Sequence, residues 1–83
     1  MARYHVGIDV GKRTHHVCVR DLSKDSYSKV HSISCDEEGF LKLISALQKF
    51  SSNKDDFLIA VEACGPYSTT LNYFLLSQGY KLV

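Results

Sequence analysis

Two acidic residues, Asp9 and Glu62, lie at positions where their carboxylates could bind a metal ion. Asp9 comes near the end of an alternating apolar segment, and Glu62 directly follows a short unbroken apolar run. If these segments are neighbouring parallel strands, both carboxylates lie at the edge of the sheet where ligands bind. Carboxylate oxygens suit Mg²⁺ or Mn²⁺, and such an ion would assist phosphoryl chemistry. Acidic residues beside turns and strand ends are also ordinary capping or solvated groups, so both interpretations stay open.

The segment from Gly7 to Lys12 permits a second function. A strand, an Asp, then a Gly and a basic residue resembles the first phosphate loop of actin-like and sugar-kinase ATPases. It lacks the glycine spacing of a P-loop. The simpler interpretation is a hairpin turn that needs Gly11 for positive φ. An actin-like ATPase lobe is therefore one alternative, and a catalytically silent interaction module is another.

Histidine and cysteine offer a weaker basis for a metal site. His15 and His16 are adjacent within an alternating segment, so their side chains should point to opposite faces of a strand. Two such residues do not easily share one ion. Cys64 lies next to the acidic Glu62 with no base to activate it, and we expect a small buried side chain.

Three other residues flank the two carboxylates in sequence. Lys12 and Arg13 follow Asp9, and Tyr67 follows Glu62. Cations and hydroxyls are common partners of phosphate, so these side chains are candidates for contacts with a DNA backbone. The alternatives are a solvated turn and a tyrosine packed in the core.

The hydrophobic pattern predicts the elements that position these residues. Period-two alternation from Tyr4 to Val10 and from His15 to Arg20 indicates two strands, and residues 27–33 form a weaker third. Short connections make the three an antiparallel meander. The run from Phe57 to Val61 suits a strand buried on both faces, as in parallel pairing.

Two helices and a last strand complete the pattern. Ser34 and Glu37 have the spacing of a capping box. Pro66 is placed to begin a second helix and Gly79 to end it, before a strand at residues 80–83. The predicted order is β-β-β-α-β-α-β, a mixed α/β sheet of the ribonuclease H-like class. Apolar residues at helical spacing form two stripes: Phe40, Leu43, Ile44, Leu47 and Phe50, then Tyr67, Leu71, Phe74 and Leu75.

Composition limits the remaining possibilities. The 83 residues suit one domain, and a net charge of +1 means that any DNA contact must come from a local patch. Three widely spaced cysteines fit a reducing, intracellular setting, and no segment suggests secretion or membrane spanning. Because the chain stops within an apolar, strand-forming run, we expect a fragment of a longer protein that self-associates through uncovered surfaces.

These motifs together resemble a known family. The chain is similar to the N-terminal, RuvC-like domain of DEDD-type insertion-sequence transposases, relatives of the Piv invertases. The resemblance covers nearly all of residues 1–83, and Cys64 is a mild departure where the family often has Thr. The motifs are residues 7–12 (GIDVGK), His15 or His16, residues 38–40 (EGF) with Leu43 and Leu47, residues 61–67 (VEACGPY), and Leu71, Leu75, Gly79 and Tyr80.

The resemblance implies a function. In this family four acidic residues hold divalent metal, Mg²⁺ or Mn²⁺, for DNA cleavage and strand transfer. Asp9 and Glu62 match the first two, and the others would lie beyond Val83. The resemblance further implies a DNA partner, in some members a structured guide RNA, a homo-oligomer, and action in the prokaryotic cytoplasm at the nucleoid. The fragment alone should be inactive.

Overall fold

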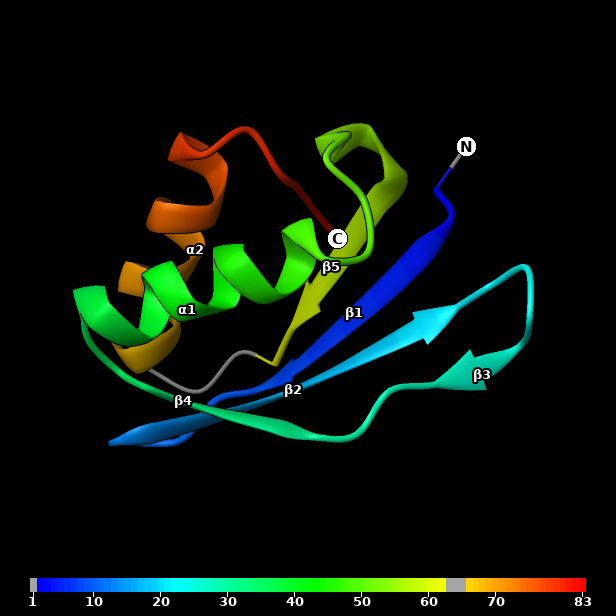
Figure 1. Cartoon of the computed structure of the whole chain (residues 1–83). Coiled ribbons are helices and arrows are strands. Elements are labelled where there is room, and N and C mark those ends of the chain that lie inside the picture. Colours follow the sequence, from blue (N-terminus) through cyan, green and yellow to red (C-terminus); the bar gives the residue numbers. More distant parts are fainter. Residues whose placement is uncertain (1, 63–65) are drawn as a thin grey trace.

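A computed structural model describes residues 2–62 and 66–83, in which two helices cover one face of a mixed sheet (Figure 1). The predicted mixed α/β class is confirmed. Within the described residues the strands are ordered β3-β2-β1-β5-β6, and β4 also pairs with β2. The elements are β1 (Tyr4–Asp9), β2 (Thr14–Asp21), β3 (Ser26–Tyr27), β4 (His31–Ser34), α1 (Glu37–Gln48), the 3₁₀ helix η1 (Lys54–Asp56), β5 (Phe57–Val61), α2 (Pro66–Ser77) and β6 (Lys81–Leu82).

The central strand β1 joins an antiparallel half of the sheet to a parallel half. It pairs antiparallel with β2 and parallel with β5, and β5 pairs parallel with β6. Along β1 buried and exposed residues alternate strictly, with Tyr4, Val6 and Ile8 facing the helices. The period-two pattern therefore has its usual cause, a strand with one face in the core.

The predicted third strand is divided in two by a bulge. Val17 pairs with His31, whereas Arg20 pairs with Tyr27, so two residues of β2 face three residues at positions 28–30. The Ser28 hydroxyl accepts a hydrogen bond from the Val19 N–H at 3.0 Å, and the Ser28 N–H donates to the Val19 carbonyl at 2.8 Å. An extra residue of this kind interrupts the ladder and bends the strand.

Helix α1 begins two residues later than the capping box predicts. Asp36 is the N-cap, and its carboxylate accepts a hydrogen bond from the Gly39 N–H at 2.8 Å. The Ser34 hydroxyl instead donates to Asp36 at 2.7 Å from the end of β4. Both hydrogen bonds lower the pKa of Asp36, that from Ser34 most strongly. The predicted cap at Ser34 is wrong because β4 extends through that residue.

Helix α2 ends as predicted at Gly79. This residue has φ +94°, in the left-handed region that favours glycine. Its N–H donates to the Leu76 carbonyl at 3.0 Å, and the Tyr80 N–H donates to the Leu75 carbonyl at 3.1 Å. The pair of bonds is a Schellman motif, which turns the chain from α2 into β6.

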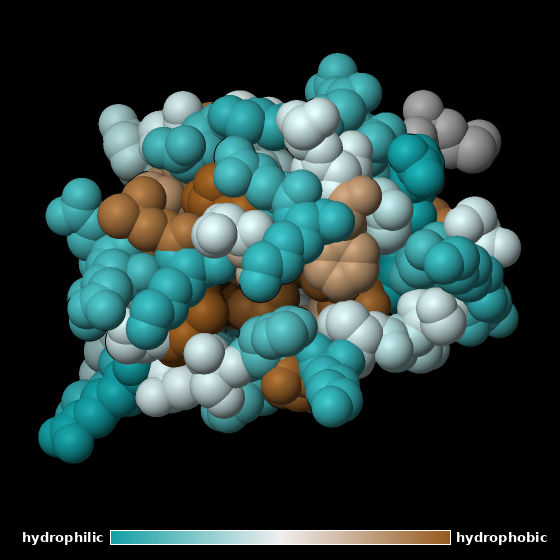
Figure 2. Space-filling view, viewed as in Figure 1, coloured by the Kyte–Doolittle hydropathy of each residue, from teal (hydrophilic) through white to brown (hydrophobic). Residues whose placement is uncertain are grey.

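Both apolar stripes pack on the same face of the sheet. Their most deeply buried members are Leu43, Leu47, Leu71 and Leu75, which lie in the same core as Phe57 and Ile59 of β5. Phe50 lies just beyond α1 and is 36% exposed, yet its ring meets the Tyr4 ring edge-on at 5.5 Å. Figure 2, drawn from the same side as Figure 1, shows a mainly hydrophilic surface with small apolar patches.

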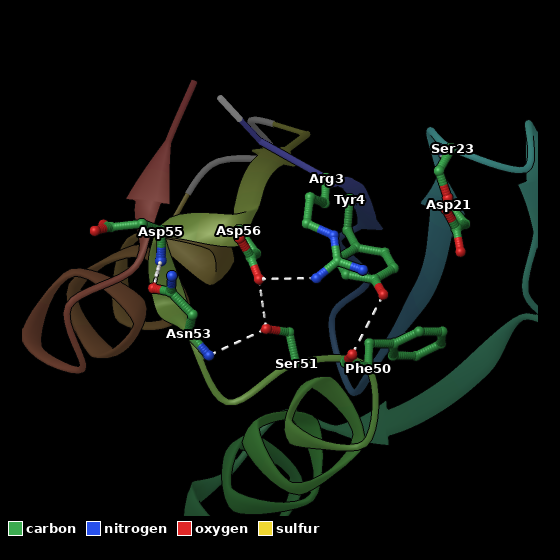
Figure 3. Close-up of polar contacts among 9 residues, drawn as sticks. All are labelled: Arg3, Tyr4, Asp21, Ser23, Phe50, Ser51, Asn53, Asp55 and Asp56. Atoms are coloured by element: carbon green, nitrogen blue, oxygen red, sulfur yellow. Dashed lines mark hydrogen bonds and ion pairs between the residues drawn. The ribbon is translucent and has the colours of Figure 1, made fainter.

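A polar network fixes the entry into β5 next to the start of β1 (Figure 3). Asp56 accepts a hydrogen bond from the Ser51 hydroxyl at 2.6 Å and lies 3.6 Å from the Arg3 guanidinium. The Arg3 N–H donates to the Asp56 carbonyl at 2.8 Å. The Tyr4 hydroxyl donates to the Phe50 carbonyl at 3.2 Å. These contacts help to set the register between β1 and β5. The register decides which residues lie side by side at the opposite end of the two strands.

Candidate metal site

The ends of β1 and β5 bring Asp9 and Glu62 together. The parallel register pairs Ile8 with Val61, so the next residues along the two strands are the acidic pair. The Glu62 N–H donates to the Ile8 carbonyl at 3.0 Å, which extends the ladder to Glu62 itself. Both side chains are exposed on the face of the sheet opposite the described helices. The sequence prediction that these strands are parallel neighbours is confirmed.

The two carboxyl groups interact directly. A side-chain hydrogen bond with Asp9 and the negative charge of Asp9 raise the pKa of Glu62 above its ordinary value. Two carboxyl groups this close repel each other when both are ionised, and a shared proton or a cation relieves the repulsion. The pair therefore has the chemistry of an oxygen-only cation site.

The acidic pair borders a shallow depression of about 790 Å³ on the open sheet face. Its floor contains small side chains, among them Gly7 and Ala60, and His16 and Cys18 contribute from β2. Sequence reasoning weighed His16 only as part of a histidine metal site and did not place it beside Asp9. It pairs with Asp9 across the β1–β2 hairpin. The length of the hairpin turn is the signal that could have revealed this, because it sets the register.

The turn between β1 and β2 carries Lys12 and Arg13. Both are exposed, and both lie at the same end of β1 as Asp9. Gly11 is needed here for close approach, since a Cβ atom would lie 2.4 Å from the Thr14 carbonyl oxygen. Among the described glycines only Gly79 has positive φ, so the predicted reason for Gly11 is wrong although the hairpin turn is present.

The adjacent histidines separate as predicted. His15 is fully buried on the helix side, where its Nδ1 accepts a hydrogen bond from the Gly11 N–H at 3.2 Å and its ring stacks 6.3 Å from Phe40. His16 is exposed on the open face. Burial, and then the nearby His16, lower the pKa of His15. His15 is therefore a neutral core residue that braces the turn after Asp9.

Tyr67 and Cys64 are the other residues that the sequence singled out. Tyr67 is half-buried in the first turn of α2 and packs against the core. Cys64 lies outside the described residues. A second depression, of about 600 Å³, lies between α1 and α2 around Phe40 and Phe74, away from the acidic pair.

Two absences hold for residues 2–62 and 66–83. They contain no group of three or more His, Cys, Asp or Glu side chains that could hold a metal ion. Neither α1 nor α2 has the length and apolar character required to cross a membrane.

Comparison with known proteins identifies the family. The family model for DEDD transposases of the IS110 type, described as Transposase, matches residues 6–83. A search of curated proteins finds no match. The matched segment includes Asp9, Glu62 and every strand except the first two residues of β1. The chain therefore belongs to the DEDD transposase family of the IS110 type.

Proposed function

We propose that this chain is the N-terminal part of a ribonuclease H-like, RuvC-like catalytic domain of a DNA transposase. The observation that carries the proposal is the parallel β1–β5 pair with Asp9 and Glu62 at its end. The antiparallel β1–β2–β4 arrangement beside it supports the same fold. In the longer protein the domain acts on DNA phosphodiesters, by cleavage and strand transfer.

Asp9 and Glu62 would hold the divalent ion, Mg²⁺ or Mn²⁺. The donor set fits because it is oxygen-only and because the neighbouring Asp9 raises the pKa of Glu62, a repulsion that a bound cation would relieve. When bound, the ion polarises a phosphate and lowers the pKa of an attacking hydroxyl or water. The protein's own part is to fix the two carboxylates on strands of a packed sheet, which limits their movement during the reaction.

DNA would approach along the edge that carries the β1–β2 turn. Lys12 and Arg13 are exposed there and would contact phosphates beside the acidic pair. Tyr67 would contribute through its hydroxyl at the start of α2. The chain alone would neither cut nor join DNA, because two carboxylates provide only part of a two-metal ligand set.

Metal binding by the chain itself tests the first step. We expect Mn²⁺ to broaden the NMR signals of Asp9 and Glu62, and Mg²⁺ to lower the pKa of Glu62. Asp9→Ala should abolish both effects. Asp55→Ala is the matched control, since Asp55 is an exposed carboxylate at the other end of β5. Equal broadening in wild type and Asp9→Ala would remove the basis for this metal site.

Transposition by the longer protein tests the second step. Asp9→Ala or Glu62→Ala should abolish strand cleavage while leaving the circular dichroism spectrum nearly unchanged, because both side chains are exposed. Lys12→Ala should weaken DNA binding without abolishing cleavage. A Glu62→Ala transposase with robust activity would contradict the proposed catalytic role.

A further inference from the structure

His16 lies on the open face of the sheet, in the same row across the strands as the acidic pair. The strand registers give the members of this row as Ser32 of β4, His16 of β2, Asp9 of β1 and Glu62 at the end of β5. All of them are exposed, and neighbouring strands lie about 4.8 Å apart. His16 is therefore the immediate neighbour of Asp9, on the side away from Glu62.

The row offers hydrogen-bond donors on only one side of the acidic pair. β6 ends at Leu82, whose partner is Ile59, so no strand of the described chain lies beyond Glu62 at this level. On the other side, the imidazole of His16 carries an N–H, whereas ionised carboxylates can only accept hydrogen bonds. A phosphate brought to the acidic pair therefore finds the nearest side-chain donor of this row at His16.

The side chain of His16 is available for such a contact. Within residues 2–62 and 66–83 its imidazole makes no hydrogen bond or ion pair, whereas the neighbouring His15 is buried and accepts from the Gly11 N–H. Nor does His16 form a three-membered metal group with Asp9 and Glu62, since the described residues contain no such group. Its place is beside the carboxylates rather than among the ligands that they provide.

The sheet fixes the backbone of His16 and leaves space at its ring. Strand β2 is paired on both sides at this position, with Asp9 of β1 and Ser32 of β4. The ring borders the depression of about 790 Å³ to which Gly7 and Ala60 contribute small side chains. A side chain held on a paired strand beside open volume suits the positioning of a ligand, because little of the site has to move on binding.

We propose that His16 contacts the substrate: its imidazole N–H donates a hydrogen bond to a phosphate oxygen of the DNA strand bound at the acidic pair. That strand then lies over β1 and β2, in the antiparallel half of the sheet, and not over β5 and β6. The path continues to the exposed Lys12 and Arg13, which directly precede β2. The inference rests on the proposed function and adds the side of the acidic pair on which the DNA lies.

His5 provides a matched control within the same strand pair. It is exposed on the same face of β1, four residues before Asp9, which corresponds to about 13 Å along the strand. Replacing His5 or His16 removes the same chemical group from the same face of the sheet. A contact with the substrate at the acidic pair predicts an effect for His16 alone.

Cleavage kinetics of the longer transposase test the contact. His16→Leu removes the donor and should lower kcat/KM about ten- to hundredfold, the usual effect of losing a hydrogen bond to a charged group. His16→Gln keeps an N–H donor at the end of the side chain and should recover most of this loss, and His5→Leu should match wild type. Wild-type kinetics in His16→Leu overturn the proposal, and so does a loss in His16→Gln as deep as in His16→Leu.

Metal binding by the 83-residue chain separates this inference from the proposed function. Mn²⁺ should broaden the NMR signals of Asp9 and Glu62 equally in wild type and His16→Leu. Loss of broadening in His16→Leu would make His16 a metal ligand and overturn its contact with DNA. No broadening in wild type contradicts the proposed function, and the inference falls with it. A fully active His16→Leu transposase with normal Mn²⁺ binding overturns the inference alone.

Discussion

At the scale of single residues, His15 shows how the core supports the site edge. Its imidazole is fully buried and holds the Gly11 N–H in the turn that follows Asp9. Its Nε2 has no hydrogen-bond partner among the described residues. A proton added to this ring would be buried without compensation and would remove the acceptor that Gly11 uses. His15 therefore makes the turn sensitive to acid.

The lowered pKa of His15 predicts how stability changes with pH. Below pH 6.5, the ordinary pKa of histidine, His15 binds a proton in the unfolded chain but stays neutral in the folded chain. The contribution is thus fully present above pH 6.5 and is lost as pH falls through 6.5 towards the folded pKa, with a slope of up to about 1.4 kcal/mol per pH unit. Urea denaturation between pH 5 and 8 would measure it.

His15→Gln should remove this part of the pH dependence, whereas His31→Gln, at an exposed position, should retain it. An unchanged acid dependence in His15→Gln would assign the effect to other groups. The sequence predicted that His15 and His16 would face opposite sides, because adjacent residues on a strand do so. It did not show which of them enters the core, since that depends on contacts with α1 such as Phe40.

At the scale of elements, the junction of β4 and α1 depends on Gly39. A Cβ atom there would lie 1.9 Å from the Ser34 carbonyl oxygen, so the end of the strand passes directly against the first turn of the helix. No flexible side chain can yield at this contact, because the atom concerned belongs to the backbone. The junction must shift to accommodate any other residue.

Gly39→Ala should therefore destabilise the fold by about 1–3 kcal/mol, although alanine normally favours a helix over glycine. Gly7→Ala is the matched control. Its Cβ would meet nothing within 4 Å, and the change should be neutral or stabilising by about 0.5 kcal/mol. Chemical denaturation of both variants provides the comparison. Equal stabilities would mean that the β4–α1 junction relaxes freely.

The elements also show what local patterns can and cannot specify. The strands that hold Asp9 and Glu62 were predictable, because each has an unambiguous apolar period or run. The interruption at residues 28–30 was not, since a bulge arises from how Ser28 meets Val19 on a neighbouring strand. The cap at Asp36 was missed for a similar reason. Both Ser34 and Asp36 are good caps, and the pairing of β4 with β2 decides between them.

At the scale of the whole molecule, a single layer of helices supports the sheet. An 83-residue domain has a total stability of roughly 4–12 kcal/mol. Leu47 of α1 is fully buried, and Leu47→Ala should cost about 2–5 kcal/mol, enough to unfold much of a marginal population. Leu41→Ala, on the same helix at 54% exposure, should cost less than about 0.5 kcal/mol.

Thermal melts at fixed protein concentration would compare the two variants. A similar loss in both would place the hydrophobic face of α1 on the wrong side of the helix. The burial of one helical stripe was predictable from its spacing. The identity of the open face was also foreseeable, since Asp9 and the apolar residues of β1 alternate. The sequence did not show which residues of neighbouring strands lie side by side on that face, because this depends on the strand registers, which no local pattern contains.

The parallel pairing of β1 with β5 has a consequence for how the protein is made. Tyr4 pairs with Phe57, so the strand that leaves the ribosome first must wait for a partner synthesised more than fifty residues later. The hairpin of β1 and β2 can close in the meantime, with its apolar side uncovered. Contacts so distant in sequence form late and slowly. Nascent chains that stop before Phe57 should therefore bind chaperones, and release should coincide with the emergence of β5.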